Sequence, residues 1–127
     1  MNEPVWLEQE TLLLLHSSSI ARFGGAEGVR DQGLLESALA RPRNLFAYEK
    51  VSDLADLAAA YAFGLIRNHA FVDGNKRIAF LTVGIFLDLN GAVLDAEAAD
   101  CISAVTALAE NSIGESEFAA WIRANLR

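Results

Sequence analysis

Residues 68–77, with the sequence NHAFVDGNKR, carry the side chains of this chain that are best suited to chemistry. His69 comes first, and Asp73 follows four residues later. A histidine can accept a proton near neutral pH, and a carboxylate can hold a magnesium ion. Lys76 and Arg77 add two cations directly afterwards. This combination suits phosphoryl transfer, which needs a base for a hydroxyl group and positive charge around a phosphate.

The backbone expected around Gly74 favours the same chemistry. Asn75 is predicted to begin a helix, and the first turn of a helix presents unpaired N–H groups and the positive end of the helix dipole. Gly74 has no side chain to keep an anion away from those groups. Lys76 and Arg77 lie in the same turn, where cations oppose the dipole unless an anion binds. The pattern therefore predicts an anion-binding helix start.

Each of these residues also has a purely structural interpretation. A histidine at the end of an apolar helix face is commonly a core residue with satisfied hydrogen bonds. An Asp-Gly-Asn sequence before a helix is ordinarily a turn with a helix cap. Phe71 is most simply a core anchor for that turn. Residue types and spacing alone leave both interpretations of residues 68–77 open.

The rest of the chain is predicted to be helical and to form one all-α domain over residues 1–127. Apolar spacing and capping residues indicate six helices. Their approximate ranges are 7–22, 32–40, 53–66, 75–89, 95–110 and 112–122. The helix at 75–89 is apolar on nearly every side, which predicts a buried central helix.

Several residues are predicted to start or stop these helices. Gly24 ends the first helix, and Asp31 caps the second, which Pro42 is expected to end. Residues 41–53 would then be irregular, as a loop or a small hairpin. Asp95 is expected to cap the fifth helix.

A capping box is expected before the last helix, with Ser112 as the cap and Glu115 as its partner.

The composition narrows the class of protein. With 127 residues and 53% hydrophobic residues, the chain can bury one core. Its longest apolar run, residues 78–87, is too short to span a bilayer, and residues 1–10 do not resemble a signal peptide. A net charge of −7 argues against direct nucleic-acid binding. The one cysteine, Cys101, is expected to be a small buried hydrophobe, and a cytoplasmic location is expected.

The segment HAFVDGNKR (69–77) closely resembles the signature of the Fic/Doc family, His-x-Phe-x-(Asp/Glu/Asn)-(Gly/Ala)-Asn-(Gly/Lys)-Arg. Residues 15–42 and 86–91 resemble the flanking segments of its death-on-curing branch, so the resemblance covers roughly residues 7–125. It implies a six-helix Fic/Doc-type bundle with a short flap. Fic proteins mostly transfer AMP onto protein hydroxyl groups. Death-on-curing proteins are toxins of type II toxin–antitoxin pairs, and they phosphorylate elongation factor Tu with ATP and so arrest translation.

The resemblance implies a role for each residue of the segment. His69 would be the catalytic base, and Asp73 would coordinate Mg²⁺. The nucleotide phosphates would be bound by the start of the helix, and Phe71 would anchor the loop in the core. The phosphate-binding residues would be Gly74, Asn75, Lys76 and Arg77. Residues 43–49 would correspond, by position only, to the flap beside which the target chain lies.

Three residues bear on which group is transferred and how well. Lys76 stands where AMP-transferring members have glycine, and Phe80 stands where many of them have a second arginine. Both favour transfer of the terminal phosphate of ATP. Ala70 replaces the usual proline, which should cost only about 0.4–1 kcal/mol of preorganisation. AMP transfer and a non-catalytic binding module of the same fold are the alternatives.

The resemblance also implies an antitoxin partner whose C-terminal segment folds on the toxin and which makes any contact with DNA. An acidic toxin would suit a basic partner. Thr106, Glu110 and Asn111 fit the short inhibitory pattern of self-restrained Fic proteins, although they can equally be ordinary residues at a helix end.

Overall fold

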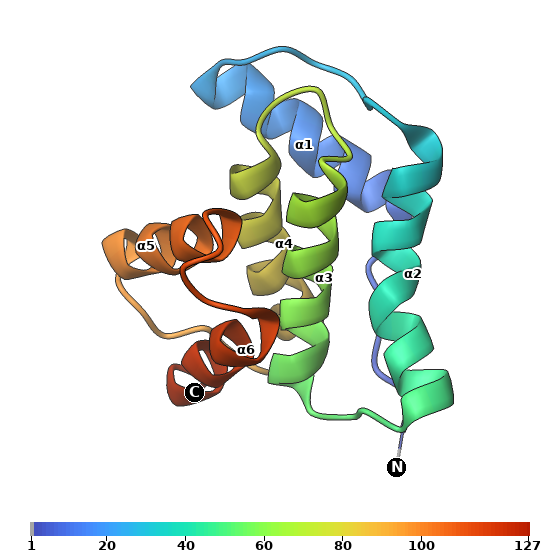
Figure 1. The fold of residues 1–127 in the computed structure, drawn as a ribbon, viewed down its shortest axis with the longest axis vertical. Helices are drawn as coiled ribbons and strands as arrows, with labels where there is room; N and C mark the ends of the chain where they lie inside the picture. The colour runs from blue at the N-terminus through green and yellow to red at the C-terminus, as the bar shows by residue number, and fades with distance from the viewer. Residues whose placement is uncertain (1) are drawn as a thin grey trace.

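The computed structural model describes residues 2–127 and contains six helices in that range, which confirms the all-α prediction (Figure 1). The helices are α1 (Gln9–Phe23), α2 (Gln32–Glu49), α3 (Leu54–Asn68), α4 (Asn75–Leu89), α5 (Ala98–Ala109) and α6 (Glu115–Ala124). Extended pairing within the described range is limited to two isolated bridges, Val29–Phe71 and Leu94–Leu126. No helix in residues 2–127 combines the length and the apolar character needed to cross a membrane.

Helix α3 is the buried centre of the bundle. It packs against α2, α4 and α6, and Figure 1 shows it between α2 on one side and α4 to α6 on the other. Residues 57–62 and 64–65 are all buried, and Tyr61 is completely inaccessible. We predicted instead that α4 would be central. Its range is as predicted, but Phe80 and Leu81 are only partly buried, because they line a cleft.

Pro42 does not end α2, contrary to prediction. The helix continues through Pro42 to Glu49, so the expected irregular stretch is helical over residues 41–49. A proline removes one N–H donor but its φ angle is compatible with a helix, and this ring is buried. The helix ends instead at Lys50, which adopts the left-handed conformation, with φ 60°.

The starts of the last two helices are also displaced from their predicted positions. Asp95 lies in an extended segment, where its N–H donates to the carbonyl of Asn125 at 2.7 Å, and Glu97 is the residue that caps α5. The cap of α6 is Gly114, whose N–H donates to Glu117 Oε1 at 3.0 Å, rather than Ser112. Neither helix start is capped by a side chain of its N-cap residue, so no capping residue in the sequence marks the true start.

Two glycines inside helices give a paired prediction about packing. A Cβ atom at Gly64 would lie 3.2 Å from Ala38 Cα and 3.3 Å from its Cβ, whereas a Cβ at Gly84 would meet no atom within 4 Å. We expect Gly64→Ala to lower the free energy of unfolding by about 1–3 kcal/mol, because backbone atoms of α2 cannot rotate away. The control, Gly84→Ala, should raise it by roughly 0.5–1 kcal/mol. Urea unfolding measures both, and equal stabilisation by the two changes would contradict close packing of α2 on α3.

Candidate active site

A cleft of about 890 Å³ opens beside the loop that joins α3 to α4. Figure 1 shows this loop at the upper end of the molecule. Six of the predicted site residues line it, on the end of α3, the loop and the start of α4. They are His69, Asp73, Gly74, Asn75, Lys76 and Arg77. The seventh, Phe71, is buried beneath the loop. The sequence prediction thus identified residues that the fold brings to one cleft.

His69 stands at the end of α3 with an exposed imidazole that faces this cleft. It is the residue after the last helical turn, and its backbone is left-handed, with φ 48° and ψ 54°. Its Nδ1 accepts a hydrogen bond from Asn75 Nδ2 at 3.3 Å. That distance is slightly longer than an ordinary hydrogen bond, so the contact orients the ring only weakly. The histidine is therefore available to solvent and ligands rather than a satisfied core residue.

Asn75 is more deeply involved in the loop than the anion-binding prediction implied. Its side chain is buried, with Oδ1 accepting from the N–H of Phe71 at 3.0 Å and Nδ2 donating to the carbonyl of Phe71 at 2.9 Å. These two bonds fix the orientation of the amide, because the Phe71 N–H can only donate. The side chain of Asn75 therefore closes the loop, and only its backbone N–H belongs to the open start of α4.

Phe71 anchors the loop as predicted, and its partner is a residue that the sequence did not reveal. The Phe71 side chain is 1% exposed and stacks on His16 of α1, with ring centroids 3.8 Å apart. His16 is itself buried, and its Nε2 donates to the carbonyl of Asp73 at 2.8 Å. His16 therefore supports the loop from below.

Asp73 presents an ionised carboxylate to the cleft. Its Oδ1 accepts from the N–H of Gly74 at 2.8 Å, and its Oδ2 accepts from the N–H of Ala26 at 3.3 Å. These two backbone donors lower the pKa of the carboxyl group below its ordinary value of 3.8. The group is consequently charged throughout the neutral range.

The start of α4 is open, as the predicted anion-binding site requires. Gly74 precedes the helix with φ 74°, a left-handed conformation that favours glycine, and no side chain caps the helix. Lys76 is exposed, and Arg77 makes three long contacts of 3.4 Å with Ser19 and Gly24. Both cations line the cleft and retain free donors for a phosphate.

The rest of the cleft lining is largely apolar. It includes Phe80 and Leu81 of α4 and Ile102 and Val105 of α5.

The suggested inhibitory residues divide between two environments. Thr106 and Glu110 line the cleft, whereas Asn111, at the end of α5, accepts a hydrogen bond from Arg67. The structure therefore brings Glu110 to the same cleft as His69.

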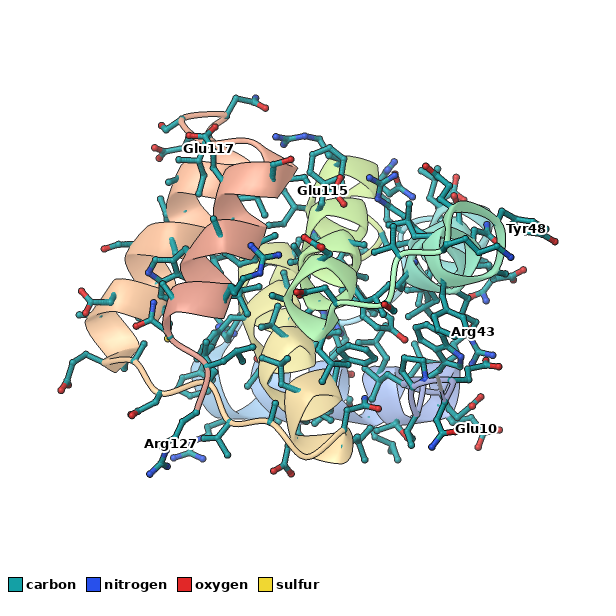
Figure 2. All side chains as sticks on the ribbon, turned by 90° about the horizontal axis from the view of Figure 1, so that it is seen from below. Glu10, Arg43, Tyr48, Glu115, Glu117 and Arg127 are labelled. Atoms are coloured by element: carbon teal, nitrogen blue, oxygen red, sulfur yellow. The ribbon has the colours of Figure 1, made fainter. Side chains whose placement is uncertain are left out.

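The segment beside the loop is residues 24–31, not the predicted flap at residues 43–49. The N–H of Val72 donates to the carbonyl of Gly28 at 3.0 Å, and Val29 and Phe71 form an isolated bridge. Residues 43–49 are helical and lie at the opposite end of α3 (Figure 1). Figure 2, which views that end, shows Tyr48 projecting away from the body.

Arg30 also belongs to the site and was not predicted. Its side chain reaches the end of α3 and donates to the carbonyls of Asn68 and His69. Neither His16 nor Arg30 stands out in the sequence, because each binds a partner far along the chain. His16 and Asp73 are 57 residues apart, and Arg30 and His69 are 39 residues apart. The carbonyl of Ala70 also accepts a hydrogen bond from this segment, from the Arg30 N–H at 2.8 Å.

Comparisons with known proteins show the family of this chain. The model of the Fic/DOC family matches residues 6–87, which include the whole loop and nearly all of α1 to α4. A relative named Protein kinase doc, from Escherichia phage P1, is 38% identical over 85 residues, covering 67% of this chain and 68% of the relative. A relative named Toxin Doc, from Mycolicibacterium smegmatis, is 45% identical over 93 residues, covering 72% of this chain and 69% of the relative. The chain belongs to the Fic/Doc family.

Proposed function

We propose that this protein is the toxin of a toxin–antitoxin pair, and that it transfers the terminal phosphate of ATP onto a hydroxyl group of elongation factor Tu. The observation that carries the proposal is the convergence, in one cleft, of a solvent-accessible histidine, an ionised aspartate and an uncapped helix start with two cations. The names of the two relatives, a protein kinase and a toxin, support it.

In the proposed reaction, His69 is the base. As the hydroxyl oxygen of the target bonds to the γ-phosphorus, its proton passes to the imidazole, and the bond between that phosphorus and the β–γ bridging oxygen breaks to release ADP. The transferring group carries its negative charge on its peripheral oxygens. The N–H groups at the start of α4, together with Lys76 and Arg77, would stabilise that charge.

Mg²⁺ is the proposed metal, and Asp73 is the residue that would hold it. Residues 2–127 contain no cluster of three or more His, Cys, Asp or Glu side chains arranged to bind a metal. A single ionised carboxylate nevertheless fits Mg²⁺, which commonly binds one or two carboxylates and completes its shell with phosphate oxygens and water. The ion would neutralise charge on the nucleotide phosphates.

Two residues support transfer of phosphate rather than AMP. Lys76 places an exposed cation one residue inside α4, in space that a glycine would leave open to the phosphate chain of ATP. Phe80, one turn further along the same helix, contributes an apolar surface to the cleft instead of a second arginine. Both changes alter how a triphosphate can lie against the start of α4.

The proposed antitoxin would be a protein whose C-terminal segment folds on this chain. The net charge of −7 suits a basic partner. Co-purification with the product of the neighbouring reading frame tests this, and the absence of a complex would contradict it.

Label transfer from ATP distinguishes the two chemistries. We expect purified protein to label elongation factor Tu from γ-labelled ATP and not from α-labelled ATP. In Lys76→Gly, γ-transfer should fall by about tenfold or more, because an interaction worth roughly 1.4 kcal/mol in the transition state corresponds to that factor. The matched control is Arg43→Ala, which changes an exposed arginine of α2. It lies at the end of the molecule opposite the loop, and the variant should leave transfer unchanged. Labelling from the α position only would replace the proposal with AMP transfer.

A further inference from the structure

Arg30 binds the end of α3 through both its side chain and its backbone N–H. Its Nε donates to the carbonyl of His69 at 2.7 Å, and its Nη2 donates to the carbonyl of Asn68 at 2.9 Å. Its backbone N–H donates to the carbonyl of Ala70 at 2.8 Å. Three consecutive carbonyl groups, at the point where the helix ends and the loop begins, therefore accept hydrogen bonds from one residue.

These contacts act on an unfavourable backbone conformation. His69 is left-handed, which costs a non-glycine residue roughly 1–3 kcal/mol unless its surroundings hold it there. The last carbonyls of a helix lack partners within the helix and carry the negative end of its dipole, so a guanidinium satisfies both. The remaining bonds of His69 are longer, at 3.2 Å from its N–H to Ile66 and 3.3 Å from its ring to Asn75.

We propose that Arg30 is a positioning residue, which holds His69 in the left-handed conformation that presents its imidazole to the cleft. Arg30 is not among the residues that line the cleft, so it acts through His69 and not on the substrate. The inference rests on the proposed function in assigning His69 as the base. It extends that function by naming what sets the position of the base.

The same segment also reaches the other reactive group. The N–H of Ala26, four residues before Arg30, donates to Asp73 Oδ2. Segment 24–31 thus contacts the backbone of the base at one point and the carboxylate at another, and links their positions. Lysine cannot reproduce the contact of Arg30, because one ammonium group lacks the two divergent N–H directions of a guanidinium.

Kinetics of Arg30→Ala test the proposal. We expect kcat for label transfer to fall by about 10- to 100-fold, as a displaced catalytic group predicts. The KM for ATP should change little, since the nucleotide is bound elsewhere. Free guanidinium, below denaturing concentrations, should restore part of kcat. Arg30→Lys should fold and lose kcat to a smaller extent.

The matched control is Arg123→Ala. Arg123 lies on α6 and binds two carboxylates at the start of α3, whereas Arg30 binds the end of α3. The two carboxylates are those of Asp53, at 3.3 Å, and Asp56, at 2.9 Å. Figure 1 shows that the start of α3 lies at the opposite end of the helix from the loop to α4. This variant should keep its kcat, with or without guanidinium. An equal fall in kcat for Arg123→Ala would show that Arg30 acts through stability alone and would overturn the proposal.

A second measurement does not depend on activity. The chain has two histidines, His16 and His69, so ring-labelled histidine gives two NMR signals. In Arg30→Ala the His69 signal should shift or broaden, while the signal of buried His16 stays in place. If neither signal moves, or if both move together, the positioning role is wrong. Should the parent protein transfer no phosphate, the proposed function fails, and these spectra still decide the role of Arg30.

Discussion

Replacing His69 with alanine should lower kcat for phosphate transfer by about 10²- to 10⁴-fold, the range expected for loss of a general base. The structure gives this residue little to do for the fold. Its side chain is exposed, and it makes one long hydrogen bond, to Asn75. The variant should therefore unfold at nearly the parent temperature and bind ATP with nearly the parent affinity. Label transfer, thermal unfolding and ATP titration measure the three quantities.

His16→Ala is the contrasting variant. His16 is 3% exposed, stacks on Phe71 and holds the carbonyl of Asp73, so its loss should lower stability as well as activity.

If His69→Ala arrests bacterial growth as fully as the parent, the protein acts without catalysis, as a binding module of the same fold.

Replacing Asn75 with alanine should destabilise the protein more than any other single change among the polar residues of the loop. The amide of Asn75 is the partner of both the N–H and the carbonyl of Phe71, which is buried. Each buried polar group left without a partner costs roughly 1–3 kcal/mol. Urea unfolding should show the loss, and the His69 ring should lose the contact that orients it.

Asn75→Asp provides the control for shape. The aspartate keeps an acceptor for the Phe71 N–H but turns an oxygen toward the Phe71 carbonyl and toward His69 Nδ1. It should therefore restore less than half of the lost stability. If Asn75→Ala weakened nucleotide binding and left stability unchanged, its side chain would be a phosphate ligand and not the closure of the loop.

The helices and the site could be predicted from the sequence where the determining interactions are local. The apolar face of α3, its start near Asp53 and the start of α4 at Asn75 each depend on neighbours within a few residues, and all were found. The motif predicted that His69 and Asp73 lie close together, and both line one cleft, because a turn between two helices keeps its residues together.

What could not be predicted depends on contacts between distant segments. Pro42 was interpreted as a helix end, because nothing nearby shows that its ring is buried in a continuous helix. The prediction put the wrong segment beside the loop, because the pairing of Val29 with Phe71 joins residues 42 positions apart in the sequence. Arg30 and His16 were missed for the same reason, since each binds a backbone carbonyl far along the chain.

The mass of intact elongation factor Tu, after incubation with this protein, ATP and Mg²⁺, tests the central claim most directly. The measurement covers both the chemistry and the residue that performs it when the parent and His69→Ala are compared side by side. We predict a gain of one phosphoryl group with the parent and no gain with His69→Ala. A gain of one adenylyl group, or a phosphoryl gain that persists without His69, would contradict a phosphotransferase that uses this histidine as its base.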